Sequence, residues 1–439
     1  MATLLFILQL LTVLAMIFIG ARVGSIALGI YGMVGVFILV FIFGLEPGVI
    51  PIDVMLIIVS VITASAALQA AGGLDYMVGQ AVRILKKHPA QITFLAPLVT
   101  WLLTFLAGTA HTCYALQPII AEIARREGVR PERPLSVATI SASIGCTGSP
   151  VSAATAAILS QQLLGGSGIG MSHILLVTIP ACLIAILTAS TVQHFVGKPL
   201  DEDPEYQRRL REGLFEKEEV KVKSENSPYQ RRSVLAFLFG VLLVVLFGIF
   251  PEWRPSVGGK PLDMGTVIEI IMMSTAALIL LVGKADVRQA VQGNVFAAGM
   301  NAMISIFGVA WMGSTFFLGH QSAIVDSVGS VFSASPLLFA VPLFLFSIML
   351  FSQAATTRTL YPVGLALGVP PLVLLAVFPA VNGYFFLPND PTEVAAIGFD
   401  RTGTTRIGRY VVNHSFQLAG FITTVVSITV GYLLTIILY

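Results

Sequence analysis

Two short stretches, GCTGSPVSAA at residues 145–154 and FLPNDPTEVAA at residues 386–396, interrupt long apolar segments with a proline among small and polar residues. A helix that breaks inside lipid exposes backbone N–H and C=O groups, and each unpaired group costs several kcal/mol. Such breaks persist only beside a wet cavity or a bound ligand. The two stretches therefore predict broken membrane helices and mark the candidate site.

The composition places most of this chain in lipid. Of its 439 residues, 56% are hydrophobic and only 11% are charged, and the mean hydropathy is +0.88. A soluble domain of this size would expose far too much apolar surface to water. The net charge of +2 and the lack of a nucleic-acid-binding motif argue against nucleic acid as a partner. We predict an all-α polytopic membrane protein surrounded by membrane lipid.

Ten apolar segments predict membrane crossings, because about 20 apolar residues in a helix span the hydrocarbon core. They are residues 3–20, 24–45, 51–72, 134–163 and 171–195 in the first half, and 233–250, 265–283, 294–318, 371–398 and 410–438 in the second. Two further apolar stretches, 91–124 and 334–368, carry polar residues midway and are predicted to be re-entrant hairpins. The first segment lacks a basic flank and an A-x-A cleavage site, so we interpret it as a retained span.

The distribution of basic residues orients this topology. With both termini on the periplasmic side, all but three of the 25 Lys and Arg residues fall on the cytoplasmic side or its rim, as the positive-inside rule requires. The exceptions are Arg254 and Lys260 outside, and Arg358 at membrane depth. Residues 198–232 carry nine basic and nine acidic residues and predict a charged cytoplasmic linker between residues 1–197 and residues 233–439.

The two halves predict an inverted repeat. Each half has five crossings and one hairpin, and five is odd, so the second half is expected to be upside down relative to the first. Similar strings support the match: AGTAHT at residues 107–112 and SQAATTRT at residues 352–359 are each followed by a proline, Pro118 or Pro362. His111 and Arg358 then occupy equivalent positions.

The first break predicts a site for an anion. Ser149 suits the N-cap of a new half-helix and Pro150 suits its first position, with Ser152 close by. The N–H groups freed there carry the positive end of the helix dipole, which favours a carboxylate.

The second break, Asn389-Asp390-Pro391-Thr392-Glu393, has an acidic cap, and its Asn389 and Thr392 are candidate substrate ligands. Asp390 and Glu393 have the spacing of a capping box. The sequence leaves open whether these carboxylates only cap the helix, bind a coupling proton or cation, or pair with Arg358. Their charge makes this break less suited to an anion than the first.

The hairpins supply further candidates. Arg358 can bind a carboxylate through two parallel hydrogen bonds, although a structural pair with Asp390 or an interfacial position are alternatives. His111 can donate a hydrogen bond to substrate together with Thr109 and Thr112, can carry a proton, or can be a plain buried histidine. The threonines of the second hairpin are similarly ambiguous: Thr356, Thr357 and Thr359.

Several longer strings resemble those of the anaerobic C4-dicarboxylate transporter family: AGGLDYMV (71–78), GVRPERPLS (128–136), LFSQAATTRTLYP (350–362) and DRTGTTRIGRYVVNH (400–414). The resemblance runs from the first crossing to the last. It implies exchange of fumarate, malate or aspartate for succinate across a bacterial inner membrane, without a cofactor. It also implies a cation at Arg358 and assigns Asp400, Thr402 and Thr404 to a family motif at the inner mouth, with a coupling or gating role.

The leading hypothesis is alternating access, with a dicarboxylate anion held between the hairpins and the half-helix ends. One rival is a Na⁺- or H⁺-coupled carboxylate symporter or antiporter with Asp390, Glu393 or Glu269 as the ion carrier. Another is a dicarboxylate sensor that acts with a partner kinase. An enzyme is not expected, because HExxH and GxSxG motifs are missing. No metal is expected at the cysteines, and a homodimer is left open.

Overall fold

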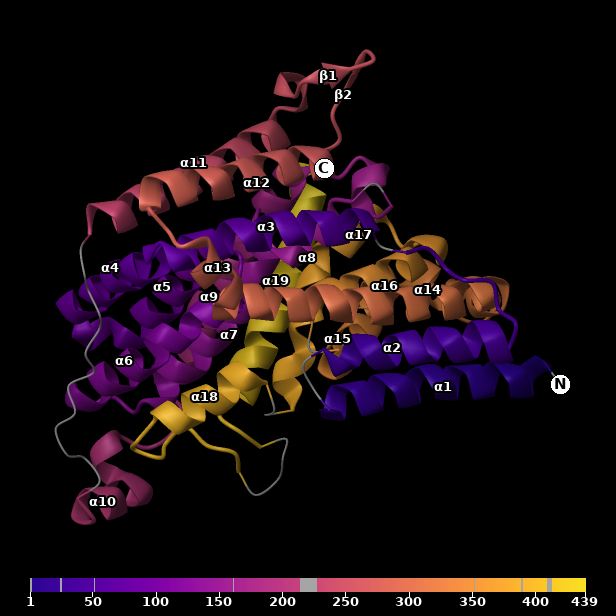
Figure 1. Ribbon diagram of the computed structural model, residues 1–439. Helices are drawn as coiled ribbons and strands as arrows, with labels where there is room; N and C mark the ends of the chain where they lie inside the picture. The colour runs from indigo at the N-terminus through magenta and orange to yellow at the C-terminus, as the bar shows by residue number, and fades with distance from the viewer. Residues whose placement is uncertain are drawn as a thin grey trace.

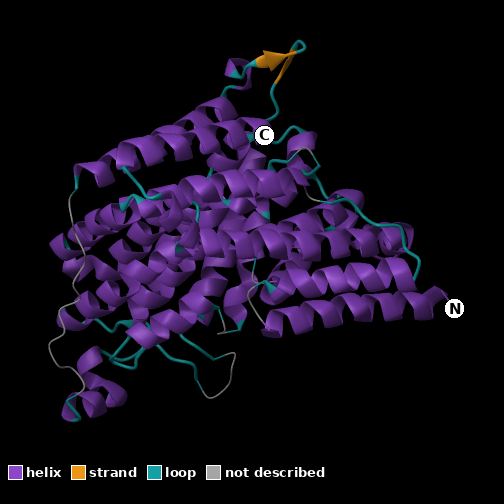
Figure 2. Ribbon diagram, in the orientation of Figure 1, coloured by secondary structure: helices purple, strands orange, loops and turns teal. Residues whose placement is uncertain are grey.

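The computed structural model describes residues 2–23, 26–50, 52–160, 162–213, 227–350, 352–387, 390–408 and 413–439. Helices make up most of this part of the chain, and its only sheet is a small hairpin of β1 (Ser256–Val257) and β2 (Lys260–Pro261) that projects from one end of the molecule (Figures 1 and 2). The predicted all-α membrane fold is confirmed.

In the first half and the linker, the described residues form ten α-helices. They are α1 (Ala2–Val23), α2 (Ala27–Phe37, continued by a π-helical turn Ile38–Ile42), α3 (Ile52–Ala70), α4 (Gly73–Lys87), α5 (Ile92–Ala107), α6 (Cys113–Arg126), α7 (Glu132–Gly148), α8 (Ala153–Ile158), α9 (Met171–His194) and α10 (Pro204–Arg211). Short 3₁₀ turns lie at η2 (Pro89–Gln91), η3 (Ala110–Thr112), η4 (Leu164–Ser167) and η5 (Leu200–Glu202). Helix α10 lies in the predicted linker and stands apart from the main bundle (Figure 1).

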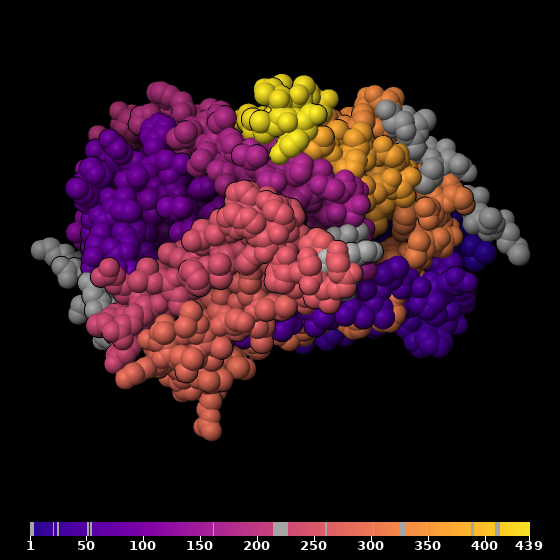
Figure 3. Space-filling view, turned by 90° about the horizontal axis from the view of Figure 1, so that it is seen from above, coloured from indigo at the N-terminus to yellow at the C-terminus, as the bar shows by residue number. Residues whose placement is uncertain are grey.

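In the second half, the described residues form nine α-helices. They are α11 (Pro228–Ile249), α12 (Met264–Gly283), α13 (Val287–Gln292), α14 (Asn294–Ala334), α15 (Ala340–Leu350), α16 (Gln353–Ala366), α17 (Pro371–Ala376), α18 (Pro391–Phe399) and α19 (Gln417–Leu438). Its 3₁₀ segments are η6 (Pro251–Trp253), η7 (Pro336–Phe339) and the longer η8 (Phe378–Phe386). In the space-filling view, the second half (salmon to yellow) lies against the purple and magenta part of the first half on one side and against its indigo part on the other (Figure 3).

Six helices of the described residues are long and apolar enough to cross a membrane, and eight spans result if two bent pairs each count as one. One bent pair joins residues 371–386, which comprise α17 and η8, to α18 at 56°, and it contains the predicted second break. The other is α3 with α4, at 72°, where the sequence predicted a crossing that ends near residue 72. Residues 89–107, the first arm of the first predicted hairpin, also pass this test, so their re-entrant course stays a prediction.

Helix α4 is amphipathic and packs against protein. Its apolar side chains Met77, Val78 and Leu85 are buried, and the helix contacts α5, α6 and α11. Arg83, Lys86 and Lys87 on its other face are exposed.

Contacts between the halves come in matched pairs. Helix α2 packs on α14 while α3 packs on α12, and α8 packs on α16 while α6 packs on α18. The first of these contacts is close: a Cβ built on Gly308 would lie 1.9 Å from the Gly29 carbonyl oxygen, so small residues bring the two backbones together. Such pairs are what a twofold relation between the halves would produce. The inverted repeat and the division at residues 198–232 remain predictions.

Candidate functional site

Four helical segments begin inside the apolar part of the molecule, and each begins at a side-chain cap. The caps hydrogen-bond the backbone N–H two or three residues further on, as N-caps do. They are Thr109 before η3 (3.4 Å), Ser152 before α8 (3.1 Å), Ser352 before α16 (3.2 Å) and Asp390 before α18 (2.9 Å). Both hairpins and both breaks therefore present a helix N-terminus, where orphan N–H groups gather.

The first break differs in detail from the prediction. Helix α7 ends at Gly148, and a turn at residues 149–152 precedes α8, so Ser152 and not Ser149 is the N-cap. The Ser149 hydroxyl accepts a hydrogen bond from the Val151 N–H at 3.3 Å, and the Ser152 hydroxyl donates to the Cys146 carbonyl at 2.5 Å. Both serine side chains are buried and hold the break together.

At the second break, half of the predicted capping box exists. The Asp390 carboxylate accepts hydrogen bonds from the N–H and the hydroxyl of Thr392. The Glu393 side chain does not reach back to the cap: it is 2% exposed, and neither of its oxygens has a hydrogen-bond partner among the described residues. The predicted substrate ligand Asn389 lies outside the described residues.

The tip of the first hairpin touches the first break. Gly108 has φ +72°, and a Cβ built on it would lie 2.6 Å from the Val151 carbonyl oxygen. Beside this contact is a cavity of about 120 Å³, lined by Gly108, Thr109, His111 and Val151 and by parts of α3 and α14. An apolar cavity of about 150 Å³ can hold benzene, so the space approaches that of a small organic ligand.

Of the predicted substrate ligands, two line this cavity. The Thr109 hydroxyl and His111 Nδ1 are 3.0 Å apart, and the His111 side chain is exposed to the cavity. The Thr112 hydroxyl is instead buried against the Thr104 hydroxyl at 3.1 Å. The second arm of the first hairpin, α6, packs on α18, so the first hairpin also meets the second break.

Arg358 lies at the far end of α8. It is 7% exposed and donates to the Ser160 hydroxyl and the Gln162 side-chain carbonyl, both at 3.1 Å. These acceptors are neutral and follow the C-terminus of α8, which carries the negative end of the helix dipole. The guanidinium is thus placed inside the protein beside the first break, as a substrate role requires, while a structural role fits equally.

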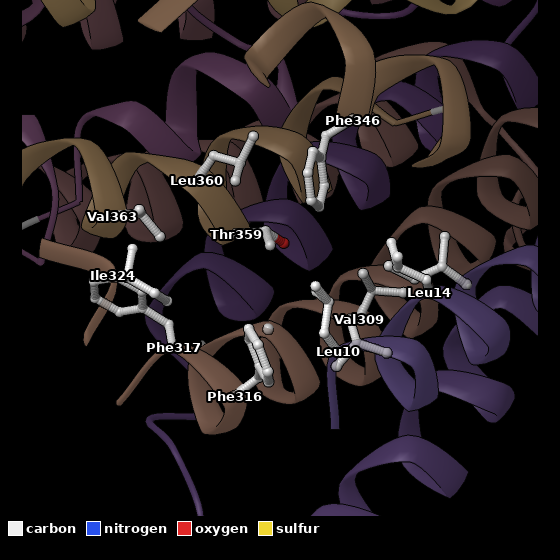
Figure 4. A pocket seen from close by; sticks show the side chains of 13 residues that line it. Leu10, Leu14, Val309, Phe316, Phe317, Ile324, Phe346, Thr359, Leu360 and Val363 are labelled. Atoms are coloured by element: carbon white, nitrogen blue, oxygen red, sulfur yellow. The ribbon is translucent and has the colours of Figure 1, made fainter. Parts of the chain in front are cut away.

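The threonines around Arg358 do not surround a common space. The Thr356 and Thr357 hydroxyls donate to carbonyls one turn earlier, each at 2.8 Å. Thr359 points into an apolar pocket of about 150 Å³ among Leu10, Phe316 and other apolar side chains (Figure 4), and its hydroxyl has no hydrogen-bond partner among the described residues.

Two glutamines, the partly buried Gln353 and the fully buried Gln117, join the halves, and neither was a candidate from the sequence. The Gln353 side-chain nitrogen contacts the Ser143 carbonyl at 2.7 Å, the Asn382 side-chain oxygen at 2.5 Å and the Tyr384 hydroxyl at 3.1 Å. It therefore connects α16 with α7 and η8. The available signal was its place directly after Ser352 at a predicted hairpin tip.

The second glutamine, Gln117, connects α6 with α7 and α18. Its side-chain nitrogen donates to the Thr392 carbonyl at 2.9 Å and to the Thr139 hydroxyl at 3.1 Å. A lone amide before Pro118 in an apolar stretch was the signal that pointed to it.

The predicted gating residues Asp400, Thr402 and Thr404 form a cluster of their own. The Asp400 carboxylate accepts hydrogen bonds from the Thr402 N–H at 2.9 Å and the Thr404 hydroxyl at 2.8 Å. The Thr404 hydroxyl oxygen in turn accepts a hydrogen bond from the Glu132 N–H at 3.2 Å, which connects the loop that follows α18 to the start of α7. The nine residues of α18 separate Asp400 from Asp390 by about 14 Å, so this cluster is distinct from the cavity.

The linker helix α10 is fastened to the same region by a buried ion network. Arg130 donates to Glu132 at 2.6 Å and to Asp203, the N-cap of α10, at 2.5 Å. Burial opposes the charge on Asp203, but the Tyr206 N–H and the Arg130 guanidinium outweigh burial and hold the pKa of Asp203 below its ordinary value. The network couples the linker to the start of α7.

The described residues contain no group of three or more His, Cys, Asp or Glu side chains arranged to hold a metal ion. The three cysteines, Cys113, Cys146 and Cys182, are buried and free.

Sequence comparison matches residues 5–439 to the family described as "Anaerobic c4-dicarboxylate membrane transporter". The chain is 44% identical to the C4-dicarboxylate transporter DcuA of Escherichia coli (strain K12), with 98% of both chains covered. It is 41% identical to the anaerobic C4-dicarboxylate transporter DcuB of Escherichia coli O157:H7, again with 98% of both covered. DcuA of Wolinella succinogenes is 40% identical over 98% of this chain and 99% of its own.

Two solved structures share the fold. The YdaH transporter of Alcanivorax borkumensis has a TM-score of 0.55 and 13% identity, and the match covers 87% of this chain and 84% of that one. MtrF of Neisseria gonorrhoeae has a TM-score of 0.51 and 12% identity, with 91% and 84% covered. Because the family match extends over nearly the whole chain and the relatives are 40–44% identical, the chain belongs to the anaerobic C4-dicarboxylate membrane transporter family.

Proposed function

We propose that this chain is a secondary transporter that exchanges C4-dicarboxylates, taking up fumarate, malate or aspartate in return for succinate, across a bacterial inner membrane. Membership of a transporter family makes it a transport protein and not an enzyme. The observation that carries the proposal is the meeting of the first hairpin and the first break around the cavity that Thr109 and His111 line. C4-dicarboxylates are named as the substrates of the relatives.

The charge distribution near the breaks suits a dianion. Helix N-termini favour negative charge, and the N-termini that Thr109, Ser152 and Ser352 cap with neutral hydroxyls begin in this part of the molecule. Thr109 and His111 offer hydrogen bonds to one carboxylate in the cavity. Arg358 lies beyond α8 and is the cation that we assign to the second carboxylate.

The location of the cavity suggests how access alternates. One wall is formed by α3 and α14, which pack on each other, and the opposite wall is formed by the first hairpin and the first break. We infer that the hairpins and broken helices move as a unit against a scaffold that includes α3 and α14. We also propose that both termini are periplasmic and that the linker at 198–232 is cytoplasmic, as the charge distribution indicates.

Counterflow in proteoliposomes tests this proposal. The purified chain is reconstituted with unlabelled fumarate inside, and uptake of radiolabelled succinate is measured with and without the internal fumarate. We expect internal fumarate, but not internal acetate, to accelerate the uptake of succinate. An uptake rate that is the same with and without internal fumarate would refute exchange, and binding without uptake would favour the sensor alternative.

A further inference from the structure

Glu393 is the buried carboxyl group whose role capping does not explain. It lies in the first turn of α18, and neither oxygen has a hydrogen-bond partner among the described residues. The side-chain oxygen of Gln117, on the adjacent α6, also lacks a partner and is fully buried. Buried polar atoms are nearly always hydrogen-bonded, so three unpartnered acceptors at one helix contact require an explanation.

What this contact lacks is a donor. The Gln117 nitrogen already donates to Thr392 and Thr139, and the Asp390 carboxylate is engaged by Thr392. A proton on the Glu393 carboxyl would supply the missing donor. It would also remove a negative charge from a buried position, where an unpaired ionised carboxylate is far more costly than the neutral acid.

The charges on the packed helices do not compensate Glu393. On α6, Glu122 is paired with Arg125 and Arg126. At the start of α7, Glu132 is bonded by Arg130, and Arg133 donates to the carbonyls of residues 196 and 197.

Two groups nearer to Glu393 complete this environment. Asp390, the N-cap of α18, is three residues before Glu393, and its carboxylate accepts hydrogen bonds from Thr392. His111, at the tip of the first hairpin, interacts electrostatically with Asp390. The thiols of Cys113 and Cys146, on α6 and α7, are buried and free.

We propose that Glu393 is a proton-binding residue that couples dicarboxylate movement to the proton gradient. One proton binds to its carboxylate while Glu393 is open to water on one side of the membrane. The proton stays bound while Glu393 is enclosed between α6 and α18, as in this structure, and it leaves as H⁺ when Glu393 becomes open to water on the other side. Because α6 and α18 both lie in the unit of hairpins and broken helices, movement of that unit against the scaffold controls which side reaches Glu393. This inference rests on the proposed transport function.

The test uses Glu393→Gln, which imitates the protonated acid and cannot release a proton. In proteoliposomes, a one-unit inward pH gradient is expected to raise the steady-state accumulation of succinate by the wild type up to about tenfold for one coupled proton. In Glu393→Gln this increase should fall to near onefold. Counterflow needs no proton release and should persist in this variant. Glu393→Asp, which keeps an acid, should retain both activities, and Glu122→Gln on the same pair of helices is the matched control.

Three results would overturn the inference. The first is a Glu393→Gln protein that still accumulates succinate in response to the pH gradient. The second is loss of counterflow in both the Gln and the Asp variants, which would make Glu393 a structural residue. The third is accumulation by the wild type that follows a Na⁺ gradient and ignores pH. Absence of counterflow in the wild type would instead refute the proposed transport function, so the two failures are distinguishable.

Discussion

Replacing Gly108 with alanine is expected to disrupt the contact between the first hairpin and the first break. Gly108 has φ +72°, and an alanine in the left-handed region costs roughly 1–2 kcal/mol. Its Cβ would also lie 2.6 Å from the Val151 carbonyl oxygen and 3.0 Å from the carbonyl carbon. Both atoms belong to the backbone, so the hairpin or the break has to move, and overpacking of this kind costs about 1–3 kcal/mol. The free energy of unfolding should fall by about 2–5 kcal/mol in total.

The chain contains a matched control for this substitution. Gly128, between α6 and α7, has φ +69°, but no atom of the described residues lies within 4 Å of its built Cβ. Gly128→Ala should therefore show only the backbone cost of about 1–2 kcal/mol. The difference between the two variants isolates the close approach to Val151.

Unfolding in mixed micelles, followed by circular dichroism, measures both stabilities, and counterflow measures transport. Because Gly108 also lines the 120 Å³ cavity, Gly108→Ala is expected to weaken succinate affinity as well, whereas Gly128→Ala should leave affinity unchanged. Equal losses of stability in the two variants, with unchanged affinity in both, would show that the contact between the hairpin tip and the break is not needed.

Three further outcomes are expected. Arg358→Gln should weaken dicarboxylate binding about ten- to a hundredfold, since a charged hydrogen bond contributes about 1.5–3 kcal/mol. The surface variant Arg126→Gln should leave binding unchanged. If titration calorimetry shows unchanged affinity for Arg358→Gln, then Arg358 is structural. Gln353→Leu should lower the free energy of unfolding by about 1–3 kcal/mol, because buried acceptors lose their donor; an unchanged denaturation midpoint would contradict this. Arg130 holds the pKa of Asp203 below its ordinary value of 3.8. The ion pair that attaches α10 should therefore persist above pH 3.8 and be lost as the pH falls further. Hydrogen exchange of α10 measures this attachment, and equal protection at pH 6 and pH 3 would refute the prediction.

The positions of the two helix breaks were predictable because their causes are local. Proline removes a backbone donor and small polar residues cap the next helix, whatever surrounds them. Asp390 caps α18 as predicted. At the first break the same preferences suggested Ser149, but the chain makes a turn first and Ser152 caps α8. That turn carries the Val151 carbonyl against Gly108, a contact between residues more than 40 positions apart that local preference does not contain.

The candidate ligands were harder to predict than the breaks. Thr109 and His111 line the cavity, but Thr112, Thr356 and Thr357 use their hydroxyls within their own hairpins. A threonine in a helix can turn its hydroxyl to a carbonyl one turn earlier or to a ligand, and the letters alone do not distinguish the two.

The sequence alone was enough to predict the lipid environment, the helical class, the family and the two helix breaks. Hydropathy, backbone hydrogen bonding and proline act over short distances, so their effects can be predicted without the tertiary structure. Three-dimensional packing set which polar groups are satisfied. Gln117 reaches the Thr392 carbonyl across 275 positions of the chain, whereas Glu393, one residue further along, has no hydrogen-bond partner among the described residues. Side-chain pairing depends on how distant helices dock, so the sequence left open whether Glu393 caps the helix or binds a coupling ion, and only the docked helices showed that its carboxyl group is buried without a hydrogen-bond partner among the described residues.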